Sequence, residues 1–272
     1  MFHHDAGAAE SHALLPTLRD LGRDLLTVSS AQRALVVARP FLACLGYWLC
    51  AALGRWPAAL ASLAGMMFFT YTSSSHEYVH RTLGLPRRTN ELLLAMTELL
   101  GLRSGHAFRI THLHHHRRFP HPDDVEAFAA SRGFLRALAT GPGHQTRLFL
   151  WAWRRADRAE RAWMAGEATA IASVLAVALV VRPLAVYATL VVLGGWLYPL
   201  ATVWWPHRAA GDTALTHTRA FRGHFVPALF LHHTYHLEHH LYPMVAAANW
   251  RTLARRLDPY LARAGVAPVR LP

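Results

Sequence analysis

The apolar residues of this chain are gathered into long uninterrupted stretches, and this feature limits the possible folds more than any other. A helix needs about 20 apolar residues to cross the ~30 Å hydrocarbon core of a bilayer. Only 16% of the residues are charged, whereas an average soluble domain has about 25%. Four stretches reach or approach the required length: residues 40–53, 57–75, 163–181 and 183–205. The pattern predicts an all-α integral membrane protein with four transmembrane helices.

The first stretch is the shortest, because residues 40–53 alone do not complete a span. It becomes long enough if the helix begins near Ala34 and Arg39 extends its guanidinium group to the lipid headgroups. Residues 54–56 are the only link to the second stretch, and Arg182 is the only link between the third and fourth. Short links join antiparallel neighbours, so the four helices are expected to form two hairpins.

The arginines indicate how these hairpins are oriented. The net charge is +12, and all 28 basic residues are arginine. Fourteen lie between positions 81 and 161 and eight between 208 and 270, whereas the hairpin tips hold only Arg55 and Arg182. By the positive-inside rule, the termini and the long middle region are cytoplasmic. The charge therefore reflects topology rather than nucleic-acid binding, and attraction of anionic lipid or an acidic electron carrier is a secondary hypothesis.

The polar regions outside the hairpins divide the chain further. Residues 1–33 are expected to be a cytoplasmic N-terminal segment without a cleavable signal, 34–250 the membrane domain, and 251–272 a cytoplasmic tail. In the middle region, residues 90–102 are apolar but too short to span, which predicts a buried or interfacial helix. Residues 147–161 mix aromatic and arginine side chains, which predicts an amphipathic helix on the inner leaflet.

Histidine is the most unusual component of the composition, with twenty copies. Three clusters have helical spacing: HEYVH at 76–80, HLHHH at 112–116 and HLEHH at 236–240. Residues i, i+3 and i+4 share one face of a helix, so each cluster can direct several imidazoles to one side. A further histidine, in WWPHR, follows the fourth stretch. The candidate metal ligands are His76, His80, His112, His115, His116, His207, His236, His239 and His240.

All nine candidates fall on the predicted cytoplasmic side, where they can converge. Nine imidazoles exceed the three or four protein ligands that a zinc site uses. Two six-coordinate ions with open positions would use the set, and imidazole suits iron. Open iron positions beside an apolar surface predict that dioxygen is used to oxidise an unactivated C–H bond. A zinc-dependent membrane hydrolase or a metal carrier remains the rival hypothesis.

The order HEYVH, HLHHH, WWPHR, HLEHH resembles the membrane fatty acid desaturase superfamily over about residues 57–250. That superfamily includes acyl desaturases, hydroxylases and carotenoid ketolases. Its three histidine boxes match the three clusters, and its isolated extra ligand matches His207. The resemblance implies a cytoplasmic helical cap that holds two non-haem irons, dioxygen as co-substrate, an apolar lipid substrate and a ferredoxin- or cytochrome-like electron donor.

The resemblance leaves the substrate open. Fatty acyl desaturation or hydroxylation is the leading prediction. The sequence PDDVEAF after the second box resembles carotenoid ketolases, so a carotenoid (β-carotene-type) ketolase or hydroxylase is the alternative. The strings PHR, HTR and YHLEHHLYP are similar to bacterial members, which implies a bacterial inner membrane. Some members hold an asparagine one turn before the isolated ligand, where this chain has Val203.

Several other residues have more than one interpretation. At least one acidic residue among Glu77, Asp123, Asp124 and Glu238 is a candidate to hold the second nitrogen of a ligand imidazole. Tyr198, Trp204 and Trp205 are interpreted as an interfacial aromatic belt, with tunnel lining as the alternative. Gly194–Gly195 is interpreted as a close-packing site.

The histidines outside the nine candidates have other expected roles. His114 lies on another helical face than its neighbours, and His232 is a weaker candidate for the ligand face. The remaining histidines are expected at the surface, with His106 and His217 the least certain: His3, His4, His12, His106, His121, His144, His217 and His224.

Overall fold

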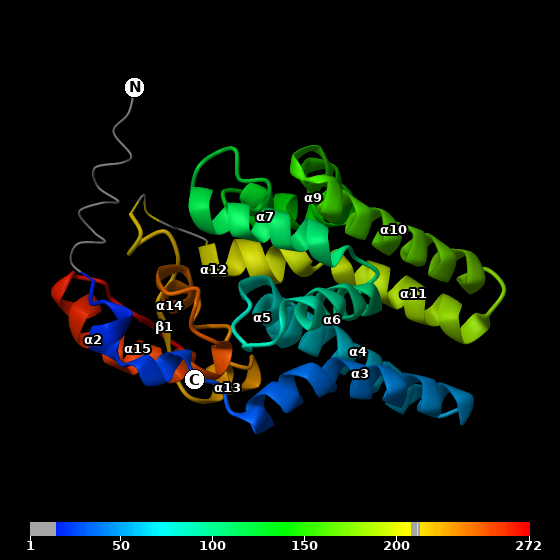
Figure 1. The fold of residues 1–272 in the computed structure, drawn as a ribbon, viewed down its shortest axis with the longest axis horizontal. Coiled ribbons are helices and arrows are strands. Elements are labelled where there is room, and N and C mark those ends of the chain that lie inside the picture. The colour runs from blue at the N-terminus through cyan, green and yellow to red at the C-terminus, as the bar shows by residue number, and fades with distance from the viewer. Residues whose placement is uncertain (1–14, 208–210, 212) are drawn as a thin grey trace.

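The computed structural model describes residues 15–207, 211 and 213–272, and this part of the chain is mostly helical (Figure 1). Its only strands are β1 (Phe221–Arg222) and β2 (Val269–Arg270), which pair in parallel. The all-α prediction is therefore confirmed apart from this short pair.

The first predicted hairpin consists of α3 (Ser30–Ala52) and α4 (Trp56–Phe69). Ser29 caps α3 through a reciprocal capping box with Gln32, which satisfies free N–H groups at the helix start. The helix therefore begins early enough to include Arg39, as the short apolar stretch required. α4 continues without a break through a π-helical segment (Thr70–Ser74) into α5 (Ser75–His80).

The second hairpin consists of α10 (Arg158–Ala178) and α11 (Arg182–Gly195), and α11 leads through a second π-helical segment (Pro199–Trp204) into α12 (Trp205–His207). Both hairpin turns lie at the same end of the molecule, on the right of Figure 1. Two helices of the described chain are long and apolar enough to cross a membrane, Arg23–Ala52 and Arg182–His207. They correspond to the first and fourth predicted spans.

The region between the hairpins forms α6 (Arg87–Leu100), α7 (Gly105–Arg118), a 3₁₀ turn (Glu126–Ala129), α8 (Phe134–Ala139) and α9 (Gly141–Arg155). The prediction of one helix over residues 147–161 is wrong. The Asp157 side chain accepts a hydrogen bond from the Glu160 backbone N–H at 2.8 Å, and the Glu160 side chain accepts from Asp157 N–H at 3.2 Å. This capping box starts α10 and separates it from α9.

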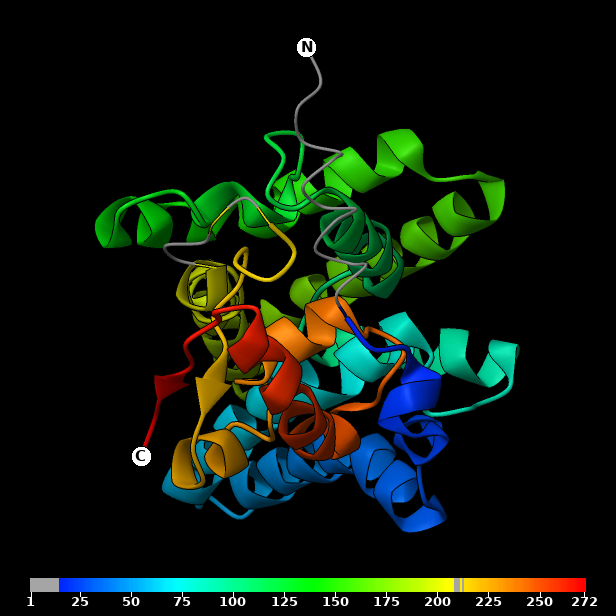
Figure 2. The ribbon, with the colours of Figure 1, turned by 90° about the vertical axis from the view of Figure 1, so that its left-hand side faces the viewer.

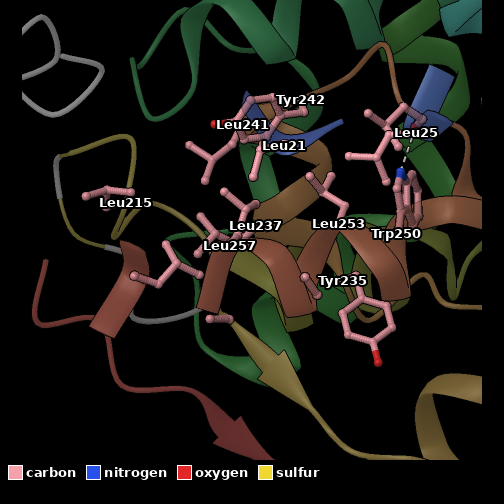
Figure 3. Packing of buried hydrophobic residues seen from close by; sticks show 14 of the residues in the cluster. Leu21, Leu25, Leu215, Tyr235, Leu237, Leu241, Tyr242, Trp250, Leu253 and Leu257 are labelled. Atoms are coloured by element: carbon pink, nitrogen blue, oxygen red, sulfur yellow. Dashed lines mark hydrogen bonds between the residues drawn. The ribbon is translucent and has the colours of Figure 1, made fainter. Parts of the chain in front are cut away.

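The C-terminal part forms α13 (Phe225–Leu229), α14 (His236–Leu241) and α15 (Ala247–Arg263), and it packs against α2 (Leu18–Leu21) and a 3₁₀ turn (Arg23–Leu26). Figure 2 views this end, where the orange and red segments lie between the green and the blue helices. A hydrophobic cluster that includes Leu21 of α2, Leu237 of α14 and Leu253 of α15 holds these helices together (Figure 3). It anchors the apolar face of α14, whose other face carries histidines.

Candidate metal centre

Five imidazoles from three helices form a first group. Its members come from α5, α7 and α14, and their ring nitrogens lie within 4.8 Å of one another: His76, His80, His112, His116 and His239. The Nε2 atom of His239 is 2.8 Å from the Nε2 atoms of both His76 and His116. The group thus joins all three histidine clusters of the sequence.

Four further imidazoles form a second group: His115, His207, His236 and His240. The Nε2 atom of His207 is 3.1 Å from that of His115, 3.1 Å from that of His236 and 3.3 Å from that of His240. Together the two groups contain the nine histidines that the sequence pointed to. The rings of His116 and His240 lie 4.4 Å apart, so the two groups are neighbours.

The local fold explains this convergence. α5 and α12 are the ends of the two long helices, and each follows a π-helical segment. A π-helical segment holds extra residues per turn and changes the face on which the following residues lie, and such segments are frequent at functional sites. His76 and His207 are thereby directed to the same centre from opposite hairpins.

Hydrogen bonds at Nδ1 fix the tautomers of three of these imidazoles. His115 Nδ1 lies 2.6 Å from Asp124 Oδ2, His112 Nδ1 lies 3.0 Å from Glu126 Oε1, and His207 Nδ1 lies 2.7 Å from the Val203 carbonyl oxygen. Ionised carboxylate and carbonyl oxygens only accept hydrogen bonds, so Nδ1 carries the proton in each ring. The Nε2 atom of each neutral ring therefore presents a lone pair to the centre.

This assignment tests whether the site fits a metal. The Nε2 atoms of His115 and His207 lie 3.1 Å apart, and while both rings are neutral neither Nε2 has a proton to donate. Two facing lone pairs repel each other unless a proton or a metal ion lies between them. Two nitrogens that are each about 2.1 Å from one ion and form a right angle lie about 3 Å apart. The donor set and its spacing thus fit a metal bound through Nε2.

The carboxylates around the centre differ partly from expectation. Asp124 holds an imidazole, as expected for at least one of the four acidic candidates. Glu126 does the same and was missed, although its position in PDDVEAF after the second box was a signal for it. Glu77 instead accepts from Ala247 N–H at 2.8 Å, and Glu238 forms an ion pair with Arg222.

The structure does not give Asp123 that role either, since its carboxylate binds the side chains of Arg118 and His121 at the surface. The Val203 side chain has no polar group for the contact that asparagine makes in some members, and its backbone oxygen accepts a hydrogen bond from His207 Nδ1.

Two histidines predicted at the surface are buried. His106 is fully buried, and its ring nitrogens contact Glu167 Oε1 at 2.7 Å and Glu91 Oε2 at 3.0 Å. His144 is 1% exposed, and burial lowers its pKa to about 4. The surface prediction is wrong for both, because side chains of helices distant in sequence cover them.

The other histidines lie outside the two groups. His114 packs on Trp151, away from the centre, as its helical position predicted. His121 and His224 are exposed, whereas the ring of His217 lies 5.1 Å from that of His240. His232 does not join the ligand face. His3, His4 and His12 lie outside the described residues.

An apolar cavity of about 370 Å³ lies between the two long helices and ends at the imidazole groups. His76 and His112 of the first group and His115 and His236 of the second lie in its wall. The unpredicted His233 also lines it, with its ring 5.3 Å from that of His76.

The rest of the cavity wall is mainly aromatic. Tyr198 and Trp205 line the cavity, which favours the tunnel alternative over a lipid-exposed belt for these two. The Trp204 Nε1–H instead donates to the Arg132 carbonyl oxygen at 2.7 Å. A Cβ on Gly194 would lie 2.4 Å from Met67 Cε, so the predicted close packing at this glycine is confirmed.

A helical fold, two adjacent imidazole groups and an apolar cavity that reaches both define a candidate metalloenzyme for an apolar substrate. A family model described as fatty acid desaturase matches residues 53–271. The match covers most of the chain, so this protein belongs to the fatty acid desaturase family, and the resemblance recognised in the sequence is confirmed. A search of curated proteins gave no significant match.

Proposed function

We propose that this protein is an integral membrane oxidoreductase that uses two non-haem irons and dioxygen to oxidise a long apolar lipid. The observation that carries the proposal is the set of imidazole lone pairs directed at one another at the end of an apolar cavity. The first group of five histidines would hold one iron and the second group of four the other. Family membership supports an oxidase of the desaturase or hydroxylase type.

The irons, when bound, would provide the site at which dioxygen is reduced and would pass on electrons that come from the donor and the substrate. Hydroxylation converts a C–H bond, dioxygen, two electrons and two protons into an alcohol and one water. Desaturation uses the same inputs, removes two hydrogens from neighbouring carbons and releases two waters. Both reactions need an external donor of two electrons, for which we propose a ferredoxin- or cytochrome-like protein.

The protein's own contribution is orientation and exclusion of water. Asp124, Glu126 and the Val203 carbonyl oxygen hold three imidazoles in one tautomer, and such outer contacts commonly tune metal affinity. The cavity volume lies within the usual range of about 300–1,000 Å³ for ligand sites. A chain held there in one register presents a fixed carbon to the centre.

Fatty acyl desaturation or hydroxylation is the leading form of this proposal. Carotenoid ketolation or hydroxylation is the alternative, and the aromatic cavity wall favours it specifically, since aromatic faces stack well on flat conjugated ligands. The wall includes Phe68, Tyr71, Phe108, Tyr198, Trp205, Phe221 and Phe230.

We further propose that four helices span a bacterial inner membrane with the hairpin tips outside and the imidazole groups on the cytoplasmic side. The coincidence of both tips at one end of the molecule supports this arrangement, as does the concentration of arginine elsewhere.

Metal analysis and product profiling test the function together. The purified protein should hold about two irons per chain, and cells that express it should gain an oxidised acyl lipid or, in a carotenoid-producing host, an oxidised pigment only with oxygen present. One zinc per chain with full activity in the absence of oxygen would instead establish the hydrolase or carrier hypothesis.

A further inference from the structure

A second and larger cavity also reaches the imidazole groups. It is an open groove of about 1050 Å³ where the starts of α6 and α10 meet the end of α7. His80 and His116 lie in its wall and are the half-buried members of the first group. Neither of them lines the apolar cavity, which reaches the centre through other imidazoles. The centre is therefore accessible by two separate routes.

The groove is rich in arginine, with five such residues in its wall: Arg81, Arg87, Arg88, Arg109 and Arg117. Arg81 and Arg109 have acidic partners, because both form ion pairs with Glu91 and Arg109 also lies 3.7 Å from Glu160. The other two acidic residues of the wall are Asp157 and Glu160, which are engaged in the capping box of α10. All three acidic residues of the groove wall therefore already interact with other groups of the protein.

Three arginines remain free. Arg87, Arg88 and Arg117 are exposed and form no ion pair within the described part of the chain. Arg87 and Arg88 lie in the first turn of α6. That first turn contains no acidic residue. The N-terminus of a helix carries a partial positive charge, so cations there are unfavourable. The chain therefore concentrates uncompensated positive charge at the route to His80 and His116.

We propose that this groove is the docking site for an acidic one-electron carrier protein, and that electrons reach the centre across the ring edges of His80 and His116. The inference rests on the proposed function, because only an oxygen-dependent oxidase needs such a donor. Each docked carrier is oxidised by one electron, and two encounters supply the two external electrons of each turnover, while the lipid substrate supplies the other two that dioxygen takes up. The protons come from solvent.

The two cavities suit different occupants. A folded protein cannot enter the apolar cavity, which the lipid substrate is proposed to fill. The open groove admits the edge of a protein surface, and complementary charge guides and orients such an encounter. Electron-transfer complexes use small interfaces, so a few arginines beside the exposed imidazole edges are sufficient.

The test compares two pairs of charge reversals in the full-length purified protein. The variant R87E/R88E changes the groove, whereas R255E/R263E makes the same change in charge at exposed positions of α15. The probe is an acidic plant-type [2Fe–2S] ferredoxin, and its Kd is measured with both the iron-loaded and the metal-free protein. R87E/R88E should weaken binding at least about tenfold and reduce its salt dependence, and R255E/R263E should stay within about twofold of the wild type.

Two results overturn the docking site. Equal weakening by both variants would show that net charge alone attracts the carrier. Unchanged ferredoxin affinity in R87E/R88E, together with loss of co-purified phosphatidylglycerol, would show that the groove holds anionic lipid instead. In both cases the iron content and oxygen dependence would still support the proposed function, so the two failures are distinguishable.

Discussion

At the scale of single residues, the outer hydrogen bonds of the imidazoles decide what the centre can bind. His112, His115 and His207 each donate from Nδ1 to a fixed acceptor. The acceptors come from a 3₁₀ turn, a loop and a backbone carbonyl, so no single element is responsible. Their common effect is to leave Nε2 deprotonated and ready to ligate.

Replacing Asp124 should therefore weaken metal binding. D124A removes the acceptor of His115 and should lower iron affinity by about 10- to 100-fold. D124N should be milder, because its amide oxygen still accepts from the imidazole. Iron retained after dialysis against a chelator measures the effect. D123A is the control, since Asp123 contacts no ligand imidazole, and equal iron retention in D123A and D124A would contradict the role.

Alanine at any of the nine candidate ligands should abolish turnover and reduce bound iron, because each removes one nitrogen donor. H224A is the matched control, since His224 is exposed and bonds only Arg251 among the described residues. Product formation and iron per chain are measured together. Normal turnover in H207A would remove His207 from the ligand set.

The burial of His144 predicts that stability depends on pH. Burial lowers its pKa to about 4, against about 6.5 in an unfolded chain. The unfolded state therefore binds more protons between these values, and the folded state loses up to about 3 kcal/mol of stability as the pH falls from about 6.5 to 4. H144Q should lose less Tm than the wild type between pH 7 and pH 5. A parallel decline in both proteins would show that other groups control acid stability.

At the scale of elements, the contact between α4 and α11 sets the shape of the apolar cavity. Met67 and Gly194 face each other there, and both line the cavity. Any side chain at position 194 must displace the end of Met67, which is flexible enough to move. The close approach of these helices therefore limits how much of a lipid fits beyond the centre.

G194L should shift the products toward shorter substrates, because the larger side chain fills the cavity next to Met67. The additional substitution M67A should restore part of the lost space. Chromatography of the products from a mixture of chain lengths measures the change. Gly143 offers a control, since a Cβ there meets no atom within 4 Å, and an identical product shift in G143A would point to an indirect effect.

The sequence predicted elements well where one physical rule dominates. The i, i+3, i+4 spacing on a helix predicted the grouping of all nine histidines, and uninterrupted apolar stretches predicted the hairpins. It failed where the outcome depends on contacts between distant elements. His106 and His144 look like surface residues until α6, α9 and α10 are known to pack around α7, and Glu126 binds His112 only because the chain turns back after the second box.

At the scale of the whole molecule, segments near the two ends of the described chain pack against α14, which carries the third histidine cluster. α2 and α15 contribute Leu21 and Leu253 to the cluster that also buries Leu237 of α14. α14 is only six residues long and is too short to be stable alone. Its position, and with it three of the nine imidazoles, therefore depends on segments far from the hairpins.

The arrangement of the hairpins makes the orientation testable. Arg55 and Arg182 are exposed at the two tips, and Arg263 is exposed at the end of α15. If both hairpins span the membrane, single cysteines at 55 and 182 should react with a membrane-impermeant maleimide in intact cells, because both tips should face outward. A cysteine at 263 should react only after lysis. The background needs Cys44 and Cys50 replaced by alanine, since both are free thiols. Labelling at 263 in intact cells would reverse the proposed orientation, and labelling of only one tip would mean that one hairpin does not span the membrane.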